Sequence, residues 1–252
     1  MFTRVKTPEE IENIRIAGGM LAAILQTINK EVTPGMTGKD VSEIAKRELK
    51  KIGGEPSFLG FGGFPDVICI SINDEIVHGI PDDRPFKEGD LVSFDFGVTY
   101  KGMVTDSAFS TFIGGTAPSK DAERLLKGTE RSMYAGIDAL KDGVRVGDIA
   151  SSIERVLKRE NLSIVRELVG HGVGHELHEG PDIPNYGVAG TGPKLSAGMT
   201  IAIEPMATLG THQIRVDDDG WTIRTRDGSL AAHFEHTILI TDHGHEILTA
   251  WK

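Results

Sequence analysis

The stretch GDLVSFD at residues 89–95 is echoed in the second half of the chain by GMTIAIE at residues 198–204. Each is an apolar run that follows a glycine and ends in a carboxylate. Residues 32–41 and 140–149 also resemble each other, at nearly the same offset along the chain, and both lead into a helical pattern. The repeat therefore predicts two related halves, each with a helix pair followed by a strand that ends in an acid.

Apolar spacing, helix caps and turn residues predict the order of the elements. The expected helices cover residues 8 to 31, 37 to about 51, 119 to 141 and about 147 to 160. The expected strands cover residues 67–72, 90–96 and 104–113, and the later pattern is mostly β, with Asp-Gly turn signals at 219–220 and 227–228. Helix pairs that precede strands, twice over, favour an α+β domain: a curved antiparallel sheet with helices on one face.

The composition sets outer bounds on function. Of the 252 residues, 39% are hydrophobic and 25% charged, which is typical of a soluble globular protein. The net charge of −10 argues against a DNA-binding surface, because phosphate contacts need clustered Lys and Arg. Cys69 is the only cysteine, so no intrachain disulfide and no cysteine-based zinc site is expected. Neither a signal peptide nor a membrane span is recognisable. We therefore expect one cytoplasmic, enzyme-sized domain over residues 1–252.

Charged or titratable side chains interrupt several apolar or glycine-rich segments, at Asp95, Asp106, His171, Glu204 and Glu235. A charge in a strand that is expected to be buried is costly unless a positive group meets it, and no Lys or Arg lies within these runs. Taken singly, each acid is more often exposed or paired with a distant Arg. Because the repeat relates Asp95 to Glu204, we expect the set to converge on two divalent metal ions, as in two-metal hydrolases.

Histidines are concentrated in the segment HGVGHELHE at residues 171–179. A zinc-protease helix motif fails here, since Glu179 stands where the second His would be required. No serine-nucleophile elbow or phosphate-binding loop is present either. The glycines around His171 indicate a close backbone approach rather than a helix. His78 and His178 each stand shortly before a proline, in comparable settings in the two halves.

Five segments carry a family resemblance: SINDEIVHGIP at 71–81, GHGVG at 170–174, LHE at 177–179, IEPM at 203–206 and DGSLAAHFEHT at 227–237. In order and spacing they resemble the type I methionine aminopeptidases, in the short bacterial form. The resemblance covers nearly the whole chain. It implies a single catalytic domain with the pita-bread fold, in which two pseudo-symmetric halves, roughly 8–113 and 119–250, face a dinuclear metal centre.

The same resemblance implies roles for the five acid and imidazole side chains. Asp106 and Glu235 would bridge both metal ions, Asp95 would chelate one, and His171 and Glu204 would complete the other. A water between the ions would be the nucleophile, and Glu204 would relay a proton. His78 and His178 would bind the scissile peptide and stabilise the tetrahedral intermediate. The methionine side chain would enter a pocket lined by Phe61, Phe64, Cys69, Leu177 and Trp221; for Phe61 and Phe64, plain core packing is an equal alternative.

Fe(II), Mn(II) and Co(II) all suit this ligand set, and zinc remains open. The implied substrates are the N-termini of nascent polypeptides with a small second residue, met at the ribosome by a monomer that binds neither DNA nor a membrane. A proline-directed aminopeptidase and a non-enzymatic binding protein of the same fold remain alternatives. The chain departs from the family pattern at a few positions around the site, namely Gly62, Gly97, Leu177 and His233.

Overall fold

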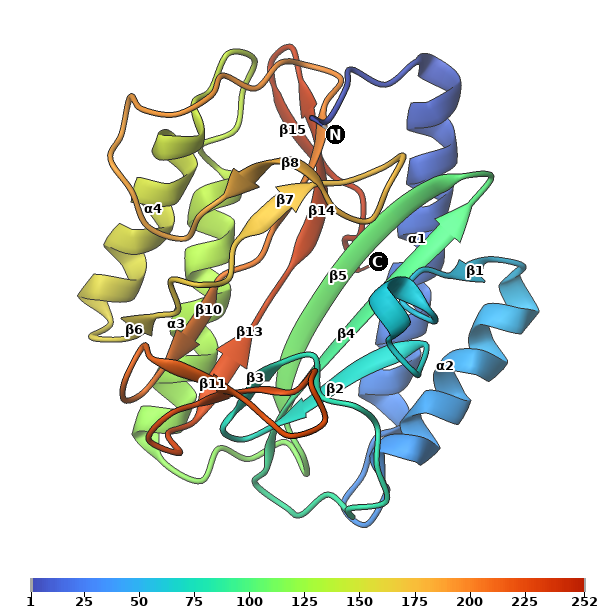
Figure 1. Cartoon of the computed structure of the whole chain (residues 1–252), viewed down its shortest axis with the longest axis vertical. Coiled ribbons are helices and arrows are strands. Elements are labelled where there is room, and N and C mark those ends of the chain that lie inside the picture. Colours follow the sequence, from blue (N-terminus) through green and yellow to red (C-terminus); the bar gives the residue numbers. More distant parts are fainter. Residues whose placement is uncertain (1, 252) are drawn as a thin grey trace.

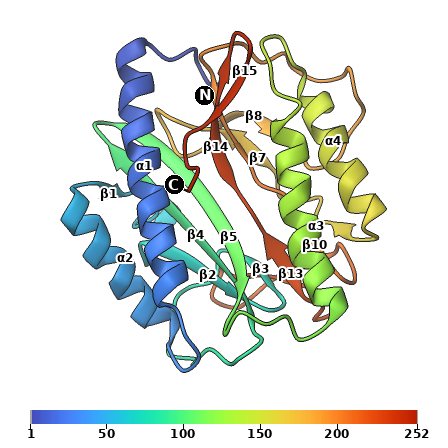
Figure 2. The ribbon, with the colours of Figure 1, turned by 180° about the vertical axis from the view of Figure 1, so that it is seen from behind.

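The computed structural model describes residues 2–251. Its helices are α1 (Pro8–Glu31), α2 (Gly38–Ile52), α3 (Lys120–Ile137) and α4 (Val146–Arg159). They all lie on one side of the strands (Figure 1), and the view from behind shows α1 and α2 over one half of the sheet and α3 and α4 over the other (Figure 2). The predicted α+β arrangement, with helices on one face of an antiparallel sheet, is confirmed.

Reciprocal side-chain caps fix the starts of the first two helices. The Glu10 amide donates to Thr7 Oγ1, while the Thr7 amide donates to the Glu10 carboxylate at 2.8 Å. Thr37 and Asp40 form the same capping box at the start of α2. Each box satisfies amides that have no partner within the helix, so the sequence signals at both helix starts act as predicted.

The third helix is shorter than the predicted range of 119 to 141. It ends at Ile137, and the Ala139 and Leu140 amides then donate to the carbonyls of Gly136 and Ile137, three residues back. Such bonds form a tighter turn than an α-helix. Leu140 is buried although it lies beyond the end of the helix. Its apolar side chain therefore fitted the helical pattern in the sequence, and the predicted helix was too long.

Two antiparallel sheets form the centre of the molecule. In the first, β4 (Leu91–Tyr100) pairs with β5 (Met103–Phe112) on one edge and with β1 (Glu55–Pro56) and β2 (Ile68–Ile72) on the other. The second has the order β15 (Gly244–Ile247), β14 (His236–Thr241), β9 (Thr200–Ile203), β7 (Gly170–Gly172) and β8 (Glu179–Ile183). Both repeated segments, 89–95 and 198–204, thus become central strands.

Two smaller antiparallel sheets flank this centre. One contains β13 (Ala231–His233), β10 (Met206–Thr208) and β6 (Ser163–Ile164), and the other β11 (Ile214–Val216), β12 (Ile223–Thr225) and β3 (Glu75–Val77). Gly220 has a φ of 78° within the loop that joins the paired strands β11 and β12. The turn at 227–228 instead joins β12 to β13, which lie in different sheets. The Asp-Gly signals therefore mark turns, of which only the first closes a hairpin.

A seam between β5 and the segment before β14 joins the two central sheets. Ala108 and Glu235 exchange backbone hydrogen bonds, at 2.9 Å from the Glu235 amide to the Ala108 carbonyl. Two residues further along the seam, Thr237 Oγ1 accepts a hydrogen bond from the Asp106 amide at 2.9 Å and donates one to the Asp106 carbonyl at 2.7 Å. The seam holds the backbones of Asp106 and Glu235 side by side, and it does so from opposite halves of the chain.

The core behind the sheets is continuous across both halves. One apolar cluster includes Phe94 and Phe96 from β4 together with Ile201 from β9 and Ile238 from β14. Burial of such side chains is the main stabilising contribution to a domain of this kind. It also fixes the central strands, so side chains on their other face have defined positions. Within residues 2–251, no helix combines the length and apolar character needed to cross a membrane.

Candidate metal centre

A single cavity of about 90 Å³ collects every candidate site residue named from the sequence. Asp95 alternates along β4 with Phe94 and Phe96, which pack in the core with residues of the helices, so the cavity lies on the other face of this strand. Its lining consists of Phe58, Phe61, Phe64, Cys69, His78, Asp95, Asp106, His171, Leu177, His178, Glu204, Trp221 and Glu235. Of these, only Phe58 was not expected. The residues come from both halves of the chain, and they divide into a polar cluster and an apolar wall.

The polar cluster brings together the five side chains that interrupt apolar segments. Atoms of Asp95, Asp106 and Glu235 lie within 4.8 Å of one another, as do atoms of His171, Glu204 and Glu235. His171 Nε2 is 3.3 Å from Glu204 Oε1 and 4.0 Å from Asp106 Oδ2. The two triads share Glu235 and lie side by side, which is the arrangement that two adjacent cations require.

None of the four carboxylates forms an ion pair with a Lys or Arg among residues 2–251, and their only basic neighbours within 4.0 Å are the imidazoles of His171 and His233. Within the buried polar atoms, Asp95 Oδ1, Asp106 Oδ1 and Glu235 Oε1 have no hydrogen-bond partner at all. Burial raises the pKa of Asp95 to about 7. Burial, and then the charges of neighbouring carboxylates, also raises the pKa of Asp106, Glu204 and Glu235 well above the usual range.

Divalent cations would remove this cost, because they would pair with the ionised carboxylates and occupy their free oxygens. The donor set is rich in hard oxygen atoms, with a single imidazole nitrogen, which suits first-row divalent metals. Burial raises the pKa of the Cys69 thiol well above its usual value, so Cys69 stays a neutral thiol and belongs to the apolar wall. The residues present therefore fit a pair of divalent ions.

His171 is held in the neutral form by its surroundings. Its Nδ1 lies 2.9 Å from the carbonyl of Gly172, and a proton on Nδ1 would leave the lone pair of Nε2 towards Glu204 and Asp106. Burial lowers the pKa of His171 to about 3. Glycines on both sides permit this close packing, since a Cβ on Gly170 would lie 2.4 Å from the Ala202 carbonyl oxygen. The predicted close backbone approach around His171 is confirmed by this contact.

His78 and His178 border the polar cluster. The rings of His171 and His178 are 4.3 Å apart, and the other side of His178 packs against Phe61 at 5.2 Å. Burial lowers the pKa of His78 to about 4 and also lowers the pKa of His178. His78 has a φ of 60°, a left-handed conformation that a non-glycine residue adopts only when its neighbours impose it. Both imidazoles are neutral at pH 7 and can donate one N–H each.

The structure distinguishes Phe61 from Phe64, the two aromatics for which pocket lining and plain core packing were equal alternatives. Phe64 is buried with Phe58, Cys69 and Leu177, and its ring lies 5.2 Å from that of Trp221. Phe64 is thus both a core residue and part of the cavity lining. Phe61, by contrast, is 44% exposed and lies at the mouth, against His178. The wall is closed at the inner end by buried apolar side chains and open at the Phe61 end.

Two departures from the family pattern have a visible packing reason. A Cβ on Gly97 would lie 2.7 Å from the Phe58 ring, so Phe58 occupies the space that a larger residue at 97 would need. Gly62 has a φ of 55°, and a Cβ there would lie 3.2 Å from Trp221. Both glycines let aromatic rings approach the cavity. Phe58 was missed in the sequence because its contact with Gly97 is purely tertiary.

His233 is a second residue that the sequence did not assign to the site. It is 2% exposed, and its Nε2 lies 3.7 Å from Glu204 Oε2 and 3.9 Å from Glu235 Oε2. Neither ring nitrogen has a hydrogen-bond partner, and burial lowers its pKa to about 3. The signal was its place two positions before Glu235, at the end of β13.

Behind the cavity, a buried ion pair ties the N-terminal segment to the loop of histidines. Lys6 Nζ lies 3.1 Å from Glu179 Oε2 and donates to Thr3 Oγ1 at 2.7 Å. The other Glu179 oxygen accepts from the amides of His175 and Glu176, at 2.6 and 3.1 Å. Glu179 follows His178 directly, so this network fixes the backbone from which His178 reaches the cavity.

The chain is similar to a known family of proteins over most of its length. The family model of the metallopeptidase family M24 matches residues 12–242, and the chain belongs to this family. Among curated proteins, it is 45% identical over 244 residues to a methionine aminopeptidase of Bacillus subtilis, covering 97% of this chain and 98% of that one. It is 42% identical to the methionine aminopeptidase of Clostridium perfringens, over 98% of this chain and 99% of that one.

Solved structures agree with this assignment. The methionine aminopeptidase of Thermotoga maritima superposes with a TM-score of 0.96 at 43% identity, covering 98% of this chain and 99% of that chain. A prolidase from Pyrococcus furiosus matches with a TM-score of 0.79 at 25% identity, and the match covers 98% of this chain but 66% of the prolidase. The predicted pita-bread fold and the predicted family resemblance are confirmed, and the methionine aminopeptidases are the nearer group.

Proposed function

We infer that this chain is a metallo-aminopeptidase that removes the N-terminal methionine from polypeptides. Near-full-length similarity to methionine aminopeptidases supports this function. The observation in the molecule that carries it is the combination, in one cavity, of a cluster of unpaired buried carboxylates and a closed apolar wall. A hydrolytic centre beside a pocket for one apolar side chain is what cleavage after a terminal methionine requires.

The metal ligands that we propose are Asp95, Asp106, His171, Glu204 and Glu235, with Asp106 and Glu235 shared between two ions. Their central position on the seam between the sheets supports the sharing. Two divalent ions bound there would activate water and polarise the scissile carbonyl. The ligand set suits Fe(II), Mn(II), Co(II) and zinc alike, so we propose a divalent pair without assigning the native metal.

The remaining steps fall to the side chains of the chain itself. Glu204 is the group that accepts the proton of the attacking water and passes it to the leaving amine, because its carboxylate lines the cavity within the polar cluster, 3.3 Å from His171 Nε2. His78 and His178 are neutral and donate N–H groups towards the peptide, where they stabilise the charge that develops on its oxygen. Phe64, Cys69, Leu177 and Trp221 enclose the methionine side chain.

We further propose a preference for a small second residue, because His78, His178 and Phe61 crowd the mouth of the cavity. The substrates are the N-termini of nascent chains, encountered at the ribosome in the cytoplasm. The catalytic unit is a single domain that acts as a monomer, with pseudo-symmetric halves of roughly 8–113 and 119–250. The contact at Ala108 and Glu235 between the halves supports this division.

A panel of three peptides tests the reaction. Met-Gly-, Met-Lys- and Ala-Pro- peptides are incubated separately with metal-loaded protein. We expect the Met-Gly- peptide to be cleaved fastest, with little cleavage of the other two. Mass spectrometry of the products measures each rate. Preferential cleavage of the Ala-Pro- peptide would overturn the proposal in favour of a proline-directed aminopeptidase. Equal cleavage of Met-Gly- and Met-Lys- would leave the methionine specificity standing and reject the small-residue preference.

His178→Ala separates binding of the peptide from binding of the metal. We expect at least about a tenfold loss in kcat, as for removal of a hydrogen bond to the developing charge, with the full metal content retained. Metal content is measured by elemental analysis on the same sample that is assayed. His175→Ala is the matched control, because His175 lies in the same loop but contacts Glu10 rather than the cavity. Loss of metal from His178→Ala would assign His178 to the ligands instead.

A further inference from the structure

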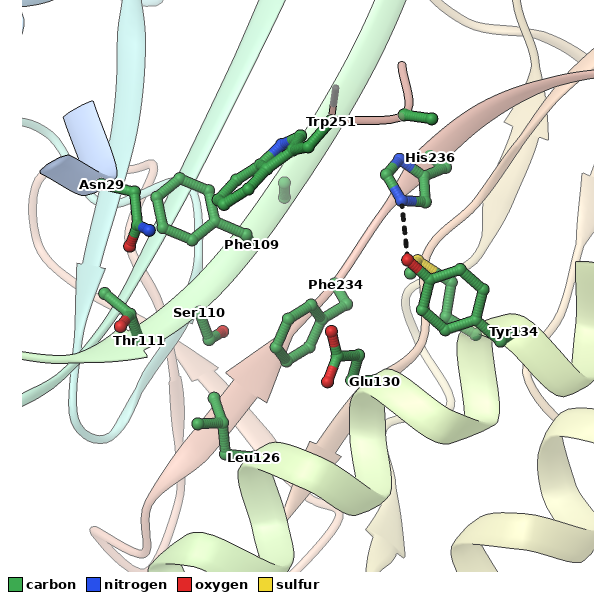
Figure 3. A pocket seen from close by; sticks show the side chains of 13 residues that line it. Asn29, Phe109, Ser110, Thr111, Leu126, Glu130, Tyr134, Phe234, His236 and Trp251 are labelled. Atoms are coloured by element: carbon green, nitrogen blue, oxygen red, sulfur yellow. Dashed lines mark hydrogen bonds between the residues drawn. The ribbon is translucent and has the colours of Figure 1, made fainter. Parts of the chain in front are cut away.

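A second pocket lies on the helix-covered face, between α1, α3, β5 and the last described residues (Figure 3). It has a volume of about 360 Å³, within the size range of about 300–1,000 Å³ for small-molecule sites. It shares no lining residue with the candidate metal centre, and nothing in the proposed reaction uses it. Its lining residues are Asn29, Ala108, Phe109, Ser110, Thr111, Leu126, Glu130, Met133, Tyr134, Phe234, His236, Ala250 and Trp251.

Aromatic rings form much of the wall of this pocket. Phe109 and Trp251 meet at 5.0 Å with an interplanar angle of 77°, and Phe109 and Phe234 are both buried. Tyr134 and Trp251 are 41% and 40% exposed, which is unusual for rings of this size and places them at the opening. Aromatic faces carry partial negative charge and attract cations. A wall of this kind therefore favours a ligand that is apolar and positively charged.

The only charged side chain in the wall is that of Glu130. Figure 3 shows its carboxylate beside the ring of Phe234, on the side of the pocket where Tyr134 lies. No Lys, Arg or His among residues 2–251 forms an ion pair with Glu130. Burial lowers the pKa of His236 to about 4, so that imidazole is neutral at pH 7. The pocket thus holds a negative charge without a counter-ion in the part of the chain that the structure describes.

The polar atoms of His236 are already engaged. Its Nδ1 lies 2.8 Å from Thr249 Oγ1, and its Nε2 lies 3.5 Å from the Tyr134 hydroxyl. This leaves the Glu130 carboxylate as the main unpaired polar group of the wall. An anion would be repelled there. A bare metal ion would find a single carboxylate in a wall of rings, which falls short of the several oxygen ligands that such ions require.

We propose that this pocket binds a small organic ammonium ion, whose apolar part packs against Phe109, Phe234 and Trp251 while its charged nitrogen pairs with Glu130. The rings supply contact area and a favourable electrostatic surface, and the carboxylate supplies the direct charge partner. This binding site is separate from the metal centre and does not depend on the identity of the substrate cleaved there.

The 2-phenylethylammonium ion is a suitable probe, and 2-phenylethanol is its neutral counterpart of similar shape. The chain has two tryptophans, Trp251 in this pocket and Trp221 in the metal centre, so the indole N–H resonances distinguish the two sites. Trp221→Phe assigns the signals. On titration of the metal-loaded protein with the ammonium ion, we expect a saturable shift of the Trp251 resonance. The alcohol should bind there at least about fivefold more weakly.

Variants of α3 test the charge partner. Glu130→Gln should weaken binding of the ammonium ion at the Trp251 site at least about fivefold. Glu123→Gln removes the same charge from an exposed position of the same helix, paired with Lys127, and should leave binding unchanged. A Trp251 resonance that does not respond, an alcohol that binds as tightly as the ammonium ion, or undiminished binding by Glu130→Gln would each overturn the proposal. The comparison of the two probes uses the wild-type chain, so it holds even if a variant misfolds.

Discussion

Glu204→Gln should abolish peptide cleavage while the protein keeps its fold. The amide cannot accept a proton from water, and loss of proton transfer alone is expected to lower kcat by about 10²–10⁴-fold. A Gln side chain is also a weaker metal ligand than a carboxylate. The substitution preserves shape, and Glu204 directly follows the central strand β9, whose pairing with β14 ends at Ile203. Initial rates on a Met-Gly- peptide, at saturating Mn(II) or Co(II), measure the effect.

Glu176→Gln provides the control for this experiment. Glu176 is exposed and lies on the histidine loop outside the cavity, so the same chemical change there should leave kcat within about twofold of wild type. Circular dichroism and thermal melting of both variants check the fold. A Glu204→Gln protein with near-wild-type turnover would remove Glu204 from the reaction and would require another group to handle the proton.

The convergence of the acids could be predicted from the sequence because the repeat places an acid at equivalent positions of the two related halves. If Asp95 and Glu204 end equivalent central strands, a symmetric arrangement places them near each other, and Asp106 and Glu235 are alike in that each precedes a short apolar run. The predicted strand ended at residue 96, whereas β4 continues to Tyr100. The added residues pair with β5 in register, but they include Gly97 and polar residues, which carry no apolar pattern to reveal a strand.

Other parts of the site depend on contacts between distant segments, and no local pattern encodes them. The approach of Phe58 to Gly97 and the ion pair of Lys6 with Glu179 each join segments that lie far apart in the sequence. The position of Phe61 is a further case. Its sequence neighbourhood is as apolar as that of Phe64, yet one ring is buried and the other lies at the mouth, because the short helical turn at Phe61–Gly63 separates them.

Removal of the metal should lower the melting temperature, and Mn(II) or Co(II) should restore it together with activity. A metal at about 100 times its Kd stabilises the folded state by about 2.7 kcal/mol. For a domain of this size, this corresponds to a shift of about 5–10 °C. Differential scanning calorimetry before chelation, after chelation and after metal addition measures it. A melting temperature indifferent to chelator, in protein first shown to contain metal, would contradict a central carboxylate-bound pair.

The pH dependence of the metal-free protein follows from the raised pKa values of the carboxylates. Burial raises the pKa of Asp95 from its ordinary value to about 7 in the folded state, so the folded state binds the proton more tightly than the unfolded state. Stability must then fall as pH rises between about 4 and about 7, since in this window the unfolded state loses its proton first. Metal-loaded protein should not show this decline. Metal binding at pH 7 should release protons, which calorimetry in buffers of different ionisation enthalpy detects.

Asp106→Asn should reduce both the stabilisation by metal and the pH dependence of the metal-free protein. The substitution removes one charge from the crowded cluster and one proposed ligand from the metals. Burial and the charges of Glu235 and Asp95 raise the pKa of Asp106, so the amide should stabilise the metal-free fold and reduce the gain on metal addition. Asp138→Asn is the control, since Asp138 is exposed at the end of α3. An Asp106→Asn protein with a full metal response would exclude Asp106 as a ligand. A smaller response at unchanged metal-free stability would assign it a role in binding but not in the repulsion that the metals relieve.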